Sequence, residues 1–270
     1  MASPTCGYAQ TPVGPVHYAR LGAGPPVVCI HQTPRSWDEF REVQALLSAS
    51  FDVIAMDLPG MGSTPPAGAA SIEGFADAAL GLIDALTLER VRVIGHHTGG
   101  VVAVRLAAIA GARVARLVLS STPYVDAEAR QVRETRPAID VVEARDDGRH
   151  LQAMWDRRGG FYPTERPDLR ARYVLDALRA DDPEAGHDAV VRYRMEHDIE
   201  RVTQPTLVVR HNADPFAAPE VGRLQAVLAN AQLVEIEHGM VPLEYAATAF
   251  AHAVTPFLKD QLSCYEMVDQ

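Results

Sequence analysis

The sequence predicts an α/β fold, with a mostly parallel, twisted sheet of about eight strands flanked by helices. Short apolar runs rich in β-branched residues, such as "PVVCIHQ" and "FDVIAMD", are each followed by a turn signal and a helical stretch. The same alternation returns at "RVRVIGH", "RLVLSST" and "PTLVVRH". These runs are apolar without interruption, which is typical of strands that are buried on both faces of a parallel sheet.

The elements can be justified in chain order. Two extended runs, around residues 5–9 and 15–20, flank "TPVGP" and predict a hairpin. Apolar residues at helical spacing then predict a helix in each of five segments: 37–48, 71–86, 99–110, 219–229 and 243–258. With 270 residues, of which 47% are hydrophobic, the chain can bury the core of one large domain.

The alternation of strands and helices stops between residues 125 and 204. This segment is charged and poor in strand patterns, and its Pro and Gly breaks predict three or four helices. We therefore expect a core domain formed by residues 1–124 and 205–270, with residues 125–204 inserted over the sheet as a helical cap.

Composition narrows the class of function. The net charge of −10 and the isoelectric point near 5.4 provide no basic field, which argues against nucleic acid or membrane surfaces as partners. Cys6, Cys29 and Cys264 have neither metal nor disulfide spacing, and no signal peptide or membrane span is apparent. We expect a cytoplasmic enzyme without cofactor or metal, acting on a small-molecule substrate; the oligomeric state, a homodimer included, stays open.

The stretch "VIGHHTGGVVAV", residues 93–104, has the strand–turn–helix pattern called a nucleophile elbow. Gly95, Gly99 and Gly100 allow the strand and helix to approach closely, so the residue at the turn projects into a cleft. That residue is His97. The positive end of the following helix disfavours an imidazolium there, and a neutral imidazole can act as a base or as a nucleophile.

Three motifs carry a resemblance to a known family: "HQTP" after the third strand, "DLPGMGST" after the fourth and "GHHTGG" after the fifth. On these motifs the chain resembles the α/β-hydrolase superfamily over about residues 5–258. It is most similar to the capped branch, which includes epoxide hydrolases, haloalkane dehalogenases and carbon–carbon bond hydrolases. Two positions depart from the pattern: His97 stands where the attacking residue is usual, and Gln32 replaces a glycine.

The resemblance implies two further catalytic residues beside His97. The stretch "PTLVVRHNADPFAAPE" places Asp214 at the acid position, although a turn or helix-capping role would also explain it. In "EIEHGMVPLEY", His238 follows the eighth strand, as the family requires. If the loop is one residue shorter, Met240 takes that place and only His97 remains to move protons.

Two backbone amides, those of Thr33 and Thr98, are expected to form an anion pocket. His31, Gln32, Tyr124 and Trp155 are candidate residues of the substrate pocket, with scaffold or core packing as the alternative. His96 is expected in a structural role. The histidines His150, His187 and His197 are expected on the surface or on helices, since they lack zinc-ligand spacing.

Three functions remain. The first is hydrolysis of a small, largely apolar ester or other carbonyl compound, with His97 attacking the acyl group or activating water. The second is a cofactor-free lyase, cyclase or decarboxylase in which His97 shuttles a proton, and the third is an inactive small-molecule-binding protein. Dehalogenase and epoxide hydrolase chemistry need an elbow aspartate, so Tyr162 and Tyr173 lack the partner that an epoxide hydrolase requires.

Overall fold

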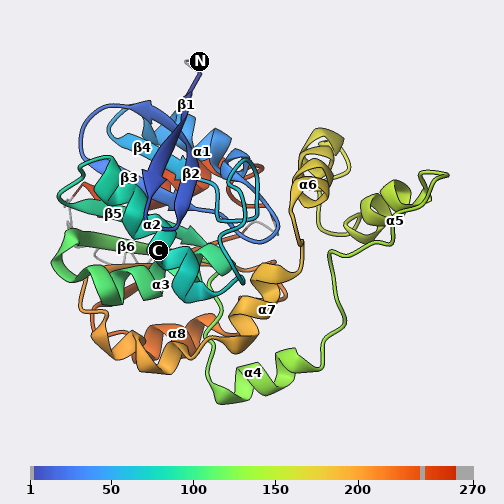
Figure 1. The fold of residues 1–270 in the computed structure, drawn as a ribbon. Coiled ribbons are helices and arrows are strands. Elements are labelled where there is room, and N and C mark those ends of the chain that lie inside the picture. Colours follow the sequence, from blue (N-terminus) through green and yellow to red (C-terminus); the bar gives the residue numbers. More distant parts are fainter. Residues whose placement is uncertain (1–2, 238–240, 260–270) are drawn as a thin grey trace, which may run out of the picture.

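A computed structural model of the protein describes residues 3–237 and 241–259. Its centre is a sheet of eight strands in the order β1-β2-β4-β3-β5-β6-β7-β8 (Figure 1). The strands are β1 (Thr5–Thr11), β2 (Gly14–Gly22), β3 (Pro26–Ile30), β4 (Asp52–Met56), β5 (Val91–His96), β6 (Val114–Ser120), β7 (Thr206–His211) and β8 (Ala231–Ile236).

The sheet is mixed but mostly parallel, as the sequence predicts. β1 and β2 form the predicted antiparallel hairpin, and β2 also pairs antiparallel with β4. Every other pair of neighbouring strands, from β4 through β8, is parallel. The carboxyl ends of β3, β5, β6 and β7 therefore meet at one edge of the sheet, where open α/β sheets bind ligands.

Helices cover both faces of the sheet. Outside the segment between β6 and β7, they are α1 (Arg41–Leu47), α2 (Ile72–Ala85), α3 (Thr98–Ala110), α8 (Val221–Val227) and α9 (Ala247–Leu258). Each lies within or next to a predicted helical segment; the first turn of the 37–48 segment is a separate 3₁₀ turn, Trp37–Phe40, that precedes α1. Helices α2, α3 and α8 pack on one face, and α1 and α9 pack on the other.

Alternation along the strands explains why both faces are covered. In β3, the buried side chains of Val28 and Ile30 join the core beneath α2 and α3, whereas those of Val27 and Cys29 join the core beneath α1 and α9. Successive strand residues point to opposite faces. An uninterrupted apolar run therefore needs helices on both sides, which is the arrangement that the sequence predicts.

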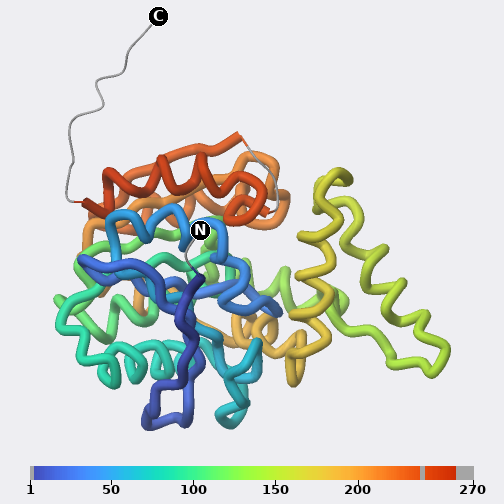
Figure 2. Tube along the Cα trace, turned by 90° about the horizontal axis from the view of Figure 1, so that it is seen from above, coloured from blue at the N-terminus to red at the C-terminus, as the bar shows by residue number. Residues whose placement is uncertain are grey.

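The segment between β6 and β7, called the helical insertion below, contains helices and no strand in the described structure. Its α-helices are α4 (Ala127–Glu134), α5 (Arg149–Arg157), α6 (Pro167–Arg179) and α7 (Ala185–Arg192). Figures 1 and 2 show α5 and α6 standing out from the sheet and its flanking helices. In the part of the chain that is described, none of the helices is long and apolar enough to cross a membrane.

Arg35 ties the insertion to the core. Its side chain is fully buried; Nε donates to Oδ2 of Asp176 on α6 at 2.9 Å, and the guanidinium makes two hydrogen bonds to Glu244, which precedes α9. A buried cation needs such partners because the cost of removing it from water is otherwise large. Arg35 therefore joins three separate segments: the loop after β3, α6 and the chain before α9.

Candidate active site

His97 occupies the turn between β5 and α3, at the edge where the carboxyl ends of the strands meet. Its backbone has φ 46° and ψ −114°, a conformation that L-residues rarely adopt. The amide of His97 donates to the carbonyl of Ser120 on β6 at 3.0 Å, and the carbonyl of His97 accepts from the amide of Gly100 at 2.9 Å. The turn is therefore held from both sides, with the imidazole facing a cavity.

Gly99 shows how closely α3 approaches the sheet. A Cβ atom at this position would lie 2.0 Å from the carbonyl oxygen of Ile30, at the end of β3. Only glycine fits such an approach. The first turn of α3 consequently lies against the loop after β3, which brings Thr98 and Thr33 to the wall of the same cavity.

The imidazole of His97 lies against Asp214, which follows β7. Nε2 of His97 is 3.0 Å from Oδ2 of Asp214, a close ion-pair contact that departs from the angle of a straight hydrogen bond. The Asp214 side chain is 1% exposed and that of His97 is 14% exposed. Burial by itself would raise the pKa of the Asp214 carboxyl, but the neighbouring His97 holds that pKa well below its usual range. Asp214 is therefore a carboxylate that can orient the imidazole and stabilise its protonated form.

Three polar side chains lie beneath this pair. Nδ1 of the buried His96 is 3.0 Å from Oγ of Ser120, and the same hydroxyl is 3.1 Å from Nε2 of His211. Burial, together with the neighbouring His97 and His211, lowers the pKa of His96 well below its ordinary value, so this imidazole is neutral. Its ring meets that of His97 edge to face, with 4.6 Å between centroids. His96 thus supports the His97 ring from below and does not line the cavity.

Two backbone amides at the cavity wall have no acceptor among the described residues. Thr98 is the first residue of α3, where amides lack an intrahelical partner. The amide of Gln32 donates to Oε2 of Glu39 at 2.9 Å, which leaves that of Thr33 as the next one in the loop. Within the described part of the chain, neither the Thr33 nor the Thr98 amide donates a hydrogen bond. Both are available to a substrate oxygen.

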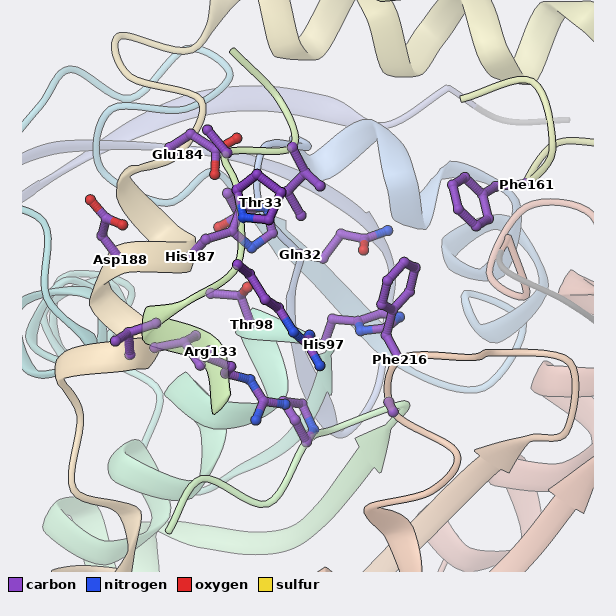
Figure 3. Close-up of a pocket in the computed structure, with 18 of the residues that line it drawn as sticks. Gln32, Thr33, His97, Thr98, Arg133, Phe161, Glu184, His187, Asp188 and Phe216 are labelled. Atoms are coloured by element: carbon purple, nitrogen blue, oxygen red, sulfur yellow. The ribbon is translucent and has the colours of Figure 1, made fainter. Parts of the chain in front are cut away.

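The cavity has a volume of about 330 Å³, and its wall combines the core with the helical insertion (Figure 3). The core contributes Gln32, Thr33, His97, Thr98 and Phe216. The insertion contributes aromatic and charged side chains, among them Arg133, Arg158, Tyr162, Tyr173 and His187. The wall therefore combines apolar and aromatic surface with several charged groups, and the size of the cavity suits a small organic substrate.

Of the four pocket residues expected from the sequence, only Gln32 lines this cavity. His31 is fully buried in the scaffold, because its Nδ1 donates to the Gln32 carbonyl at 2.8 Å and its Nε2 accepts from the Leu58 amide at 2.9 Å. The ring of Tyr124 packs under Arg223 and that of Trp155 under Arg170. Because of these contacts, the side chains of His31, Tyr124 and Trp155 do not line the cavity.

His187 lies on a helix, α7, in agreement with the sequence. The structure adds that it lines the cavity and contacts the buried carboxylate of Asp140. No local pattern could have shown this, since the two residues are 47 positions apart in an irregular segment. His238 and Met240 lie outside the described residues.

Metal ligation has no visible support in residues 3–237 and 241–259, where no group of three or more His, Cys, Asp and Glu side chains could hold an ion. The pair of His97 and Asp214 lacks a third ligand of this kind. In the described part of the chain, the arrangement offers an imidazole beside a carboxylate, two backbone amides without an acceptor, and a cavity. Such a set can transfer protons and stabilise an oxyanion.

Comparison with known proteins gives the family. Residues 25–239 match the model of the alpha/beta hydrolase fold family. Over 89 residues the chain is 40% identical to a soluble epoxide hydrolase of Corynebacterium sp. strain C12, a match covering 33% of this chain and 31% of the relative. It is 27% identical to a pimeloyl-[acyl-carrier protein] methyl ester esterase of Neisseria meningitidis over 86% of this chain and 93% of the esterase.

The fold has solved counterparts as well. The enol-lactonase from Burkholderia xenovorans LB400 superposes with a TM-score of 0.78 at 23% identity, covering 94% of this chain and all of the lactonase. The first relatives found by sequence are matched over less than a third of their own length, so their activities do not transfer as a whole. The family match spans most of the chain and includes the elbow and the Asp214 turn, and the chain therefore belongs to the alpha/beta hydrolase fold family.

Proposed function

We propose that this protein is a hydrolase that cleaves a small, largely apolar ester, with His97 as the general base that activates water. The observation that carries the proposal is the 3.0 Å contact between Nε2 of His97 and Oδ2 of Asp214. With Nε2 engaged by a carboxylate, Nδ1 is the nitrogen left to accept a proton. In this proposal Nδ1 takes that proton from a water molecule.

The reaction follows from this arrangement. His97 takes a proton from water, the oxygen of that water attacks the ester carbonyl, and Asp214 stabilises the imidazolium that forms. The oxyanion receives hydrogen bonds from the amides of Thr33 and Thr98. Removing one such donor from a hydrolase costs about 10²–10³ in kcat. The likeness to the methyl ester esterase over most of both chains supports an ester as the substrate class.

The test is hydrolysis of small aryl esters by the wild type and by His97→Ala, with His252→Ala as the matched control. His252 is an exposed histidine on α9, away from the cavity. We expect His97→Ala to lower kcat by about 10²–10⁴ and the control to keep it. Unchanged turnover in His97→Ala overturns the proposal, as does covalent labelling of a serine by a fluorophosphonate with loss of activity.

A second candidate uses the same groups without water. A cofactor-free lyase, cyclase or decarboxylase needs a base and an anion pocket for an enolate, and it has no need of an attacking hydroxyl. The imidazole at position 97, where the family resemblance implies an attacking side chain, favours it. If no ester is cleaved but a keto acid or enone is converted in a His97-dependent manner, this candidate replaces the first. Tight binding of such compounds without any product would instead indicate a binding protein.

A further inference from the structure

The helical insertion brings a second histidine–aspartate pair to the wall of the same cavity. Nε2 of His187, on α7, lies 3.0 Å from Oδ2 of Asp140. The Asp140 side chain is 1% exposed and also accepts hydrogen bonds from the Tyr173 hydroxyl and the Arg158 guanidinium. The His187 side chain is 31% exposed and lines the cavity together with His97. One cavity thus contains two imidazoles, each with its own buried carboxylate.

The position of α7 brings His187 close to the anion pocket. A Cβ atom at Gly186 would lie 1.7 Å from Oγ1 of Thr33, so the backbone of α7 packs directly against this residue. His187 is the next residue, and Figure 3 shows its ring beside Thr33, on the insertion side of His97. A carbonyl oxygen bound at the Thr33 amide would therefore have His97 on the core side and His187 on the insertion side.

The charges around His187 suit a proton donor. Burial would raise the pKa of Asp140, but its contacts with His187, Arg158 and Tyr173 hold that pKa below its ordinary value. Asp140 is therefore a carboxylate beside the imidazole. Two further acids line the cavity near His187: Glu184, whose Oε1 accepts the Asp140 amide, and Asp188, which lies 4.0 Å from Arg192.

The tyrosines of the cavity are less suited to release a proton. Burial raises the pKa of Tyr162 and of Tyr173 well above the ordinary value. Arg133 and Arg158 do not release protons at neutral pH. Besides His97, His187 is therefore the described cavity residue with an imidazole, the side chain that proteins use most often as a general acid or base.

We propose that His187 is the general acid of this site, which protonates the departing alcohol while His97 accepts the proton of the attacking water. This inference rests on the proposed esterase function. As the tetrahedral intermediate collapses, the carbonyl re-forms, the carbon–oxygen bond to the leaving group breaks, and the proton on His187 moves to the alkoxide oxygen. The products are a carboxylic acid and an alcohol. His97 then loses its proton to solvent and His187 regains one, so that the cycle closes.

The experiment is a leaving-group series, from 4-nitrophenyl through phenyl to benzyl and ethyl esters of one acid. A nitrophenolate is stable enough to leave without being protonated. An alkoxide is much more basic, so it needs a proton in order to leave. We expect log kcat/KM of the wild type to depend only weakly on the pKa of the leaving alcohol. In His187→Gln, the benzyl and ethyl esters should lose about 10²-fold or more, and the 4-nitrophenyl ester less than about 3-fold. His252→Gln serves as the matched control.

The possible outcomes separate this inference from the proposed function. Equal losses of activity for all esters in His187→Gln would overturn the general-acid proposal. His187 would then be a residue that positions the substrate. If that variant fails to fold, the wild-type series alone decides, because a steep dependence on the leaving group shows that no acid assists departure. If the wild type cleaves none of the esters, or cleaves them without need of His97, the proposed function itself has failed.

Discussion

Asp214 holds His97 with one carboxylate oxygen and its own turn with the other. Oδ2 lies 3.0 Å from Nε2 of His97, while Oδ1 accepts the amides of Phe216 at 2.9 Å and Ala217 at 3.2 Å. From the sequence, a catalytic acid and a turn-capping aspartate are alternative interpretations of this residue. The structure shows the capped turn, and this turn fixes the direction in which Oδ2 points toward His97.

The double contact of Asp214 predicts how Asp214→Asn behaves. The amide can still cap the turn, but it carries no charge to stabilise an imidazolium at His97. We expect kcat for aryl esters to fall by about 10²–10⁴, with KM changed much less. Asp77→Asn, at an exposed position of α2, should leave both constants unchanged. If Asp214→Asn retained kcat, the role of Asp214 would be limited to capping its turn.

The lowered pKa of His96 predicts a loss of stability in acid. The folded protein keeps this imidazole neutral, whereas the unfolded chain protonates it near pH 6.5. A depressed histidine pKa stabilises the fold above the unfolded value, and this contribution is lost as the pH falls below it. It changes by at most about 1.4 kcal/mol per pH unit. Urea unfolding of the wild type and of His96→Gln between pH 7 and pH 5 would measure it; parallel curves would exclude His96 as the source.

The close approach at Gly99 predicts that Gly99→Ala damages activity more than folding. The added methyl group would collide with the backbone of Ile30, so α3 must move, and Thr98 and His97 move with it. A displacement of about 1 Å at a catalytic group can cost 10²-fold in rate, and overpacking costs about 1–3 kcal/mol. Gly222→Ala, on α8 with open space around it, is the control and should leave rates unchanged. Equal rates in both variants would contradict the strained elbow.

The burial of Arg35 predicts a large stability cost for Arg35→Met. The change leaves Asp176 and Glu244 as buried charges without this partner, for which about 3–5 kcal/mol is expected. Arg20→Met breaks an ion pair with Asp52 whose arginine side chain is 40% exposed, and should cost less than about 1 kcal/mol. Urea denaturation of both variants measures the two losses in the free energy of unfolding. Similar losses would show that the Arg35 cluster contributes no more than a surface pair.

Much of the architecture could be predicted from the sequence because its signals are local. Unbroken apolar runs indicate strands buried on both faces. Residues 27–30 illustrate this, because their side chains pack alternately into the two cores on either side of the sheet. The elbow is equally local, since its glycines and His97 lie within a few residues. The place of His97 at the turn after β5 therefore agrees with the sequence.

The parts that sequence reasoning missed depend on distant contacts. The pairing of His97 with Asp214 arises from the order of β5, β6 and β7 in the sheet, and that of His187 with Asp140 from the packing of an irregular insertion. Tyr124 and Trp155 are turned away from the cavity by Arg223 and Arg170, which no local pattern connects to them. His238 stays a prediction.

The packing of Gly186 on Thr33 and the cluster around Arg35 have a consequence for how a ligand enters and leaves. Both fasten the α6 and α7 side of the insertion to the sheet, and opening that side would disrupt buried charges and close backbone packing. Residues 136–139 also border the cavity, but they form an exposed, irregular stretch after α4. We therefore expect a ligand to enter and leave the cavity past this exposed stretch rather than past α6 and α7.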